Sequence, residues 1–253
     1  MKFNINRHLF AQINVDSAAL NLLSSAVHRF SQPGEYSGII SSGQNVTGRF
    51  SLTVVESQAN PQVPGRVKID LKSTQQERFS VKAGGYCTFY VSAGPGNYSV
   101  EVSRLESEGF VKEFDSKELK SGDYFSATVI RPGSYSILNA IVNTRSELIV
   151  NYPEAGKAQR GAPAVNVECA ANQMSPARVM VDPPQGLVFV CKTASRIKIE
   201  LTRPDDRPSR VHARLAAFAK TQAQTSHPQG SGEKKPIRRY QLMPSGAKTL
   251  DET

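Results

Sequence analysis

The residues of this chain that could bind a metal or act as nucleophiles are few and widely spaced. Three cysteines are present, Cys87, Cys169 and Cys191. Their odd number and wide spacing predict neither a disulfide framework nor a zinc site. Cys87 and Cys191 lie inside apolar, strand-like runs, where a buried free thiol is the usual outcome. We therefore expect free thiols rather than metal ligands at these two positions.

The remaining candidates lack the partners that a reactive site needs. His28 has no cluster of further ligands near it in the sequence and is expected at the surface or rim. Met174 and Met180 are expected to pack in the core, and Asp205 and Asp206 belong to a segment typical of a turn. The sequence contains no GxSxG, P-loop, HExxH or paired-cysteine zinc motif. We therefore expect no catalytic, cofactor-binding or metal-binding residue, and a protein that is not an enzyme.

The composition indicates a folded protein with a basic charge balance. Its 253 residues suffice for two domains of about 100 residues plus tails, and 39% of them are hydrophobic, enough for a packed core. A formal net charge of +9 suits contact with nucleic acid, a lipid surface or an acidic protein. The sequence contains no run of about 18 consecutive apolar residues, so no transmembrane segment is predicted. The N-terminal residues lack the apolar core of a secretory signal, which favours an intracellular or virion location.

The chain matches itself at a distance of 99 residues. Residues 16–37, DSAALNLLSSAVHRFSQPGEYS, align without a gap on residues 115–136, DSKELKSGDYFSATVIRPGSYS. Seven of the 22 positions are identical, where unrelated sequences would share about one or two. Residues 79–91 match 179–191 at nearly the same distance, each as a strand, a Gly/Pro turn and a second strand. The sequence therefore predicts two copies of one structural unit.

The order of these matches predicts how the chain divides into domains. The matching halves of the unit occur at about 14–57, 66–102, 110–152 and 165–203. We therefore predict one contiguous domain at 66–152. The segments 1–57 and 165–203 would be the two halves of a second domain, because a half sandwich exposes unpaired strand edges. Closure within one chain is favoured since domain ends usually lie close together, and completion by a neighbouring subunit is the alternative.

The repeated unit resembles the cupredoxin family over about residues 79–150. The resemblance rests on a strand and glycine turn, FSVKAGGYCTFYV, on FDSKELKSGDYFSATV at 114–129, and on the corner RPGSYSI at 131–137. It implies an all-β fold of two cupredoxin-like Greek-key β-sandwiches, one contiguous and one formed from the N- and C-terminal halves, with a flexible C-terminal tail. The physical pattern agrees, because β-rich runs and Pro-Gly turns follow one another.

We expect the tyrosine after each Pro-Gly turn to stabilise the corner of the sandwich. Tyr36 and Tyr135 can each pack the ring inward while the hydroxyl reaches a backbone partner. The resemblance also implies a copper site of two His, one Cys and often a Met. The Cys would follow the corner, where 135–139 reads YSILN and 36–40 reads YSGII, and residues 58–211 contain no His. We therefore expect the fold of the family without its copper.

The C-terminal residues 204–253 differ from the body in composition. They contain nine Lys/Arg and five Asp/Glu, a net charge of +4, and the stretch from residue 225 onward is polar and rich in Gly and Pro. Such a composition predicts a partly disordered tail, although the stretch from Ser209 fits either an amphipathic helix or a strand. The candidate partner-binding residues are Lys234, Lys235, Arg238, Arg239 and Tyr240. Basic residues beside a small apolar anchor suit a segment that orders on a partner.

Three functions compete at this point. The first is a non-enzymatic structural or accessory subunit, whose tail docks on other protein subunits or on copies of itself. The second is a nucleic-acid or polyanion-binding module driven by positive charge, whose affinity would fall steeply with salt. The third is an electron-transfer or copper-handling protein with an atypical site. The degenerate repeat, the lack of a catalytic constellation and the basic tail favour the first.

Overall fold

The computed structural model describes residues 13–56, 62–107, 109–152 and 162–205, and within them every regular element is a strand. The strands are β1 (Asn14–Asp16), β2 (Ser24–Phe30), β3 (Gly34–Ser42), β4 (Asn45–Val55), β5 (Arg66–Asp70), β6 (Gln76–Lys82), β7 (Gly85–Tyr90), β8 (Tyr98–Glu106), β9 (Gly109–Asp115), β10 (Tyr124–Thr128), β11 (Gly133–Asn139), β12 (Thr144–Val150), β13 (Val165–Cys169), β14 (Met174–Ser175), β15 (Arg178–Val181), β16 (Gly186–Cys191) and β17 (Ile197–Pro204). The expected all-β class is confirmed. Among these residues no helix is long and apolar enough to cross a membrane.

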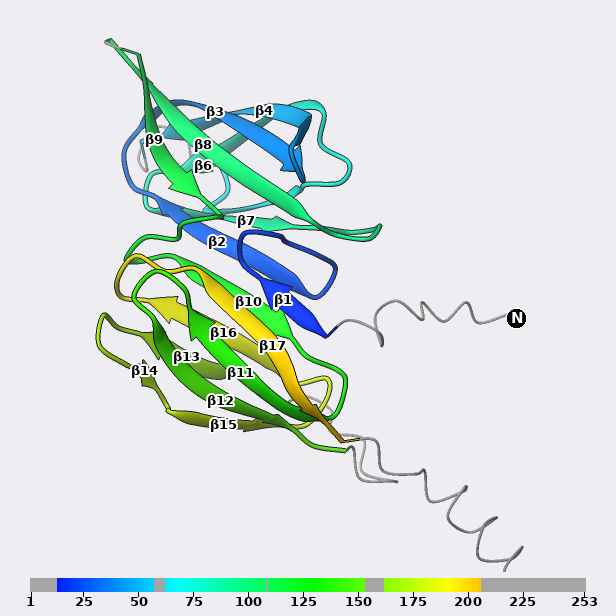
Figure 1. Ribbon diagram of the computed structural model, residues 1–253. Coiled ribbons are helices and arrows are strands. Elements are labelled where there is room, and N and C mark those ends of the chain that lie inside the picture. The colour runs from blue at the N-terminus through cyan, green and yellow to red at the C-terminus, as the bar shows by residue number, and fades with distance from the viewer. Residues whose placement is uncertain (1–12, 57–61, 108, 153–161, 206–253) are drawn as a thin grey trace, which may run out of the picture. The chain divides into compact units, whose positions relative to one another are not determined.

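The strands form three mixed sheets (Figure 1). A five-stranded sheet has the order β6-β4-β3-β8-β9, and a second has the order β1-β17-β11-β12-β15. The third sheet has seven strands in the order β14-β13-β16-β10-β2-β7-β5. Most neighbouring strands are antiparallel, but β4 and β6, β5 and β7, β12 and β15, and β13 and β16 pair in parallel. Parallel pairs need crossover connections, so the chain passes repeatedly between sheets.

Alternating side chains build the core on one face of each strand. In β2 buried and half-exposed residues alternate along the whole strand, and β7, β11 and β16 show the same period of two. Aromatic rings connect the sheets: Phe50 on β4 approaches Phe89 on β7, and Phe89 stacks on Phe114 of β9 with ring centroids 5.0 Å apart. The five-stranded sheet that contains β4 therefore shares a core with the β2–β7 part of the seven-stranded sheet.

The predicted repeat corresponds to two similar sets of strands. Strands β2 to β8 of the first copy match β10 to β17 of the second, except that β14 has no counterpart among the described strands of the first copy. Equivalent pairs join β3 to β4 and β11 to β12. The hydroxyl of Tyr36 donates to the carbonyl of Gln32 at 2.7 Å, and that of Tyr135 donates to the carbonyl of Arg131 at 2.7 Å. The expected role of the two tyrosines is therefore confirmed, with rings buried and hydroxyls bonded to backbone.

The two copies join edge to edge through β2 and β10. These strands pair antiparallel, with Val27 opposite Tyr124 and Ala26 opposite Phe125. Ser25 and Ser126 add a side-chain hydrogen bond of 2.7 Å across the same junction. Because each strand covers the edge of the other, neither copy leaves this edge open to solvent.

The first strand of each copy lies in the sheet of the other copy. β1 precedes the first copy but pairs with β17, where Ser17 donates to the carbonyl of Ile197 at 2.9 Å. β9 precedes the second copy but pairs with β8, where Ser116 donates to the carbonyl of Val100 at 3.0 Å. A few residues later each chain segment returns to its own copy, through bridges of Leu20 to Tyr98 and of Leu119 to Ser195. The two copies thus exchange first strands in a nearly symmetric way.

The strand pairing differs from the division expected from the sequence. Strands β2, β3 and β4 pair with β7, β8 and β6, so segment 1–57 closes mainly on the residues that directly follow it. Of the described strands in 1–57, β1 is the one that pairs with 165–203. The predicted contiguous domain 66–152 is likewise divided, because β10, β11 and β12 pair with later strands. The described strand pairs therefore run across the predicted boundaries at 57 and 66–152.

Candidate functional site

A buried histidine and two acidic residues meet where the two copies join. The Nδ1 atom of His28, on β2, lies 2.5 Å from Oδ1 of Asp123, which directly precedes β10. Its Nε2 atom lies 3.6 Å from Oε1 of Glu113 on β9. Both His28 and Asp123 are buried. The cluster therefore connects three strands that carry the junction and the strand exchange.

The surroundings of His28 favour a structural role for this cluster. The main-chain N–H of Lys120 donates to Oδ2 of Asp123 at 2.7 Å, which fixes the carboxylate. The imidazole packs against the rings of Phe30 and Phe114, at centroid distances of 4.6 and 5.1 Å. A His–Asp pair can orient a base for a nucleophile, but Nε2 has no hydrogen-bond partner among the described residues. The arrangement holds two carboxylates and an imidazole together, and no hydroxyl or thiol of the described residues is hydrogen-bonded to this imidazole.

The expectation for His28 was wrong, because the side chain is buried rather than at the surface. Its partner Asp123 lies 95 residues away in the sequence, so no local spacing indicated the pair. Ala127 is the residue that matches His28 in the second copy, so the cluster occurs in one copy alone. That asymmetry was visible in the self-alignment, but it did not indicate which side chain would face the histidine.

The three cysteines are free and buried. Burial raises the pKa of Cys87, Cys169 and Cys191 to about 12. Cys169 and Cys191 lie opposite each other on the parallel strands β13 and β16. Because the thiolate is the reactive form, these thiols are poor nucleophiles near neutral pH. The prediction of buried free thiols at Cys87 and Cys191 is confirmed.

The other chemical candidates lie apart from one another. Met174 is buried as expected, but Met180 on β15 is 59% exposed, so the expectation of core packing was wrong there. The carbonyl of Asp205 accepts a hydrogen bond from the hydroxyl of Tyr152 at 2.6 Å, and Asp206 lies outside the described residues. Within the described ranges, no group of three His, Cys, Asp or Glu side chains could hold a metal ion.

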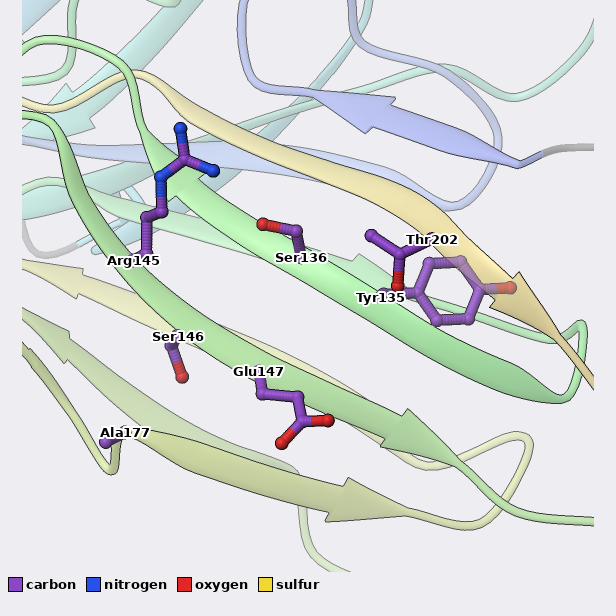
Figure 2. A pocket seen from close by; sticks show the side chains of 7 residues that line it. All are labelled: Tyr135, Ser136, Arg145, Ser146, Glu147, Ala177 and Thr202. Atoms are coloured by element: carbon purple, nitrogen blue, oxygen red, sulfur yellow. The ribbon is translucent and has the colours of Figure 1, made fainter.

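A shallow depression of about 370 Å³ lies on the outer face of β11, β12 and β17 (Figure 2). Its side chains do not converge: Arg145 and Glu147 extend from β12 in different directions. Glu147 forms an exposed ion pair of 3.2 Å with Arg178 instead. The side chains that line the depression are not aimed at one ligand atom, as those of a specific pocket would be.

The β8–β9 hairpin carries the most distinctive surface among the described residues. Three of the eight exposed large hydrophobic side chains lie on it: Leu105 is 55% exposed, Phe110 67% and Val111 45%. Leu105 faces Phe110 across the hairpin, and Arg104 faces Val111. The first pair lies on one face and the second on the other, because successive residues of a strand point to opposite faces. The hairpin extends past the neighbouring strands of its sheet (Figure 1).

The hairpin also has a free edge and a local excess of acidic residues. β9 is the last strand of its sheet, and β8 is the one described strand that pairs with it. Residues 101–117 contain five Asp/Glu and three Lys/Arg, a net charge of −2 in a chain of +9. Arg104 contacts Glu106, and Lys112 lies 3.0 Å from Asp115 and 3.3 Å from Glu101. The hydrogen bond to Asp115 is the largest cause of the raised pKa of Lys112.

The sequence indicates the turn of this hairpin but not the exposure of its apolar side chains. Gly109 is a turn signal between the strand-like residues 98–106 and 110–115. What the sequence could not give is the exposure of Leu105, Phe110 and Val111, since that depends on how far the hairpin extends beyond its sheet.

The partner-binding residues predicted in the tail, Lys234, Lys235, Arg238, Arg239 and Tyr240, lie outside the described residues. Of the predicted tail 204–253, Pro204 is the last residue of β17, and residues 206–253 lie outside the described residues. No protein-family model, curated protein sequence or solved structure matches this chain. The function is therefore inferred from the contacts, burial and charges of the chain itself.

Proposed function

We propose that this chain is a non-enzymatic structural or accessory subunit of a larger assembly. In this proposal two cupredoxin-like Greek-key β-sandwiches form a body that presents a docking surface to other protein subunits, which can be copies of the chain itself. The observation that supports it is the β8–β9 hairpin, where Leu105 and Phe110 are exposed on one face, and Val111 on the other, beside the free edge of β9. Apolar side chains grouped on an exposed edge are typical of a protein–protein contact.

The strand pairing between the two copies suits a rigid body rather than one that changes shape. The β2–β10 pairing and the exchanged strands β1 and β9 connect the two copies at three places. Separating the copies would break main-chain hydrogen bonds at each of them and expose buried side chains. Such separation is costly, so the hairpin is held in a fixed position relative to the junction.

The test is the size of the complexes that contain the protein in an extract of its native cells. We expect the wild-type chain to elute well above its monomer mass of 27.6 kDa in size-exclusion chromatography followed by immunoblotting. The double variant Leu105→Ser/Phe110→Ser should shift toward the monomer position. Because both side chains are exposed, the variant should keep the wild-type circular dichroism spectrum and unfolding midpoint.

The matched control is Val46→Ser, on β4 of the same sheet. Val46 is 54% exposed, like Leu105, but lies outside the β8–β9 hairpin. It should leave the elution profile unchanged. A wild-type chain that elutes as a monomer in the native extract would contradict the proposal. A hairpin variant that still elutes with the large complexes would contradict the assignment of the contact to the hairpin.

A further inference from the structure

We propose that the β8–β9 hairpin binds the basic tail segment 234–243 of a second copy of this chain. The inference rests on the proposed function and names the partner of the same surface. Three features of the hairpin define what it can bind: exposed apolar side chains, a free strand edge and an excess of acidic residues. The occupant must therefore bring apolar side chains, main-chain groups for pairing and positive charge.

The segment 234–243 has the composition that this surface requires. It reads KKPIRRYQLM and contains four basic and no acidic residues. Its net charge of +4 is opposite in sign to the −2 of residues 101–117. Opposite charges on two surfaces speed their encounter and select the register in which they bind. Segment 234–243 is thus a complementary ligand encoded in the same chain.

Apolar groups in the segment match those on the hairpin. Ile237, Tyr240, Leu242 and Met243 supply large apolar side chains within one short stretch. On the hairpin, Leu105 and Phe110 form an apolar pair on one face. A segment that adds to the edge of β9 would place alternate side chains against this pair, while main-chain hydrogen bonds supply affinity. Tyrosine and arginine are also the residues most enriched at the centres of protein interfaces.

The position of the chain end favours a second copy over the same copy. β17, the last described strand, belongs to a different sheet from β8 and β9. In Figure 1 its C-terminal end and the hairpin tip lie at opposite ends of the described strands. The 28 residues between Asp205 and Lys234 would span roughly 30 Å if flexible, a reach that serves a neighbouring molecule better.

Tail and hairpin are different surfaces, so the contact would be heterologous. After one such contact the pair still has one free segment, on one molecule, and one free hairpin, on the other, so the contact can repeat from head to tail. The chain would form open oligomers whose length increases with concentration. This property separates the proposal from a symmetric dimer, which would stop at two copies.

The test uses the purified full-length chain in sedimentation velocity experiments from about 1 to 100 µM, a range typical of weak to moderate protein association. We expect the weight-average mass to rise with concentration beyond that of a dimer. Leu105→Ser/Phe110→Ser should weaken association at least tenfold, and so should Arg238→Glu/Arg239→Glu in the segment. Val46→Ser and Lys248→Glu, outside the hairpin and outside the segment, are the matched controls and should associate like the wild type.

Mixing the two deficient variants gives the sharpest readout. Leu105→Ser/Phe110→Ser keeps an intact segment and Arg238→Glu/Arg239→Glu keeps an intact hairpin, so the mixture should form one-to-one dimers and nothing larger. A synthetic peptide of residues 232–245 should dissociate the wild-type oligomers, and less so at high salt.

Three results would overturn the inference: a wild-type chain that stays monomeric at every concentration, variants that associate like the wild type, or a mixture that stays monomeric. If the native extract nevertheless contains large complexes that depend on the hairpin, the proposed function stands and the partner is a different protein.

Discussion

The Nδ1 atom of His28 and the Oδ1 atom of Asp123 lie 2.5 Å apart at the junction of the two copies, and both residues are buried. His28 belongs to β2 and Asp123 precedes β10, so the contact spans the same two strands whose edges join the copies. Glu113, on the exchanged strand β9, approaches the other ring nitrogen at 3.6 Å. One imidazole therefore links the edge pairing to the strand exchange.

Removing either partner of this pair should destabilise the fold markedly. We expect His28→Ala and Asp123→Ala each to lower the free energy of unfolding by about 3 kcal/mol, because each leaves the other polar group buried without its partner. The double variant should lose less than the sum, with a coupling of at least about 1 kcal/mol. Urea denaturation followed by circular dichroism measures all three. The control is Glu147→Gln, at an exposed ion pair, which should change the free energy of unfolding by less than about 0.5 kcal/mol. If the losses for His28→Ala and Asp123→Ala simply add in the double variant, the proposed coupling is refuted.

The internal repeat provides a matched pair of glycines. Gly34 and Gly133 open equivalent strands with φ of +148° and +149°, a conformation that disfavours any side chain. An added Cβ at Gly133 would lie 2.6 Å from the carbonyl oxygen of Arg203, whereas at Gly34 the nearest atom is 3.8 Å away. We expect Gly34→Ala to cost about 1–3 kcal/mol from backbone strain, and Gly133→Ala to cost clearly more. Equal midpoints of thermal unfolding for the two variants would show that the Arg203 carbonyl moves aside freely.

The two tyrosine hydroxyls should contribute similarly to stability. Tyr36→Phe and Tyr135→Phe each remove one hydrogen bond to a carbonyl, from Gln32 and Arg131 respectively. We expect each change to lower the free energy of unfolding by about 1–2 kcal/mol, because the ring stays packed and the hydrogen bond is lost. Guanidinium denaturation of the two variants checks the values. Losses near zero would mean that water replaces the hydroxyl at both corners.

The buried thiols should make the protein unstable in alkali. Burial raises the pKa of Cys87 from 9.0 to about 12. Between these values the folded chain keeps the thiol proton and the unfolded chain releases it. The free energy of unfolding is therefore unaffected by this thiol below pH 9. As the pH rises from 9 toward 12, it falls by about 1.4 kcal/mol per pH unit for this one thiol. Unfolding free energies at several pH values above 9, under reducing conditions, should fall less steeply for Cys87→Ala than for the wild type. Parallel slopes would contradict the assignment.

Much of the local structure was predictable from the residues. β-rich runs such as that of β10, and the Pro-Gly turns at the start of β3 and β11, indicated an all-β chain of short strands. The corner tyrosines were predicted together with their backbone bonds, because a ring that packs inward must satisfy its hydroxyl. The candidate site was predicted poorly. The tail residues lie outside the described structure, and the exposure of Phe110 and the burial of His28 depend on how sheets are placed, which local pattern does not record.

The sequence alone determined the period of the repeat and the kind of element within it. It could not determine where the repeated unit starts, because two consecutive periods match themselves equally well from any starting residue. The tertiary structure decided that the first copy closes on itself through β2, β3 and β4, that β2 and β10 join edge to edge, and that β1 and β9 exchange. Strand edges pair with whichever partner the folded chain brings to them. These choices therefore depend on contacts between distant residues, such as the hydrogen bond from Ile197 N–H to the Ser17 hydroxyl, 180 residues away. Side-chain pattern fixes which face of a strand is buried, and only packing in three dimensions fixes which edge it meets.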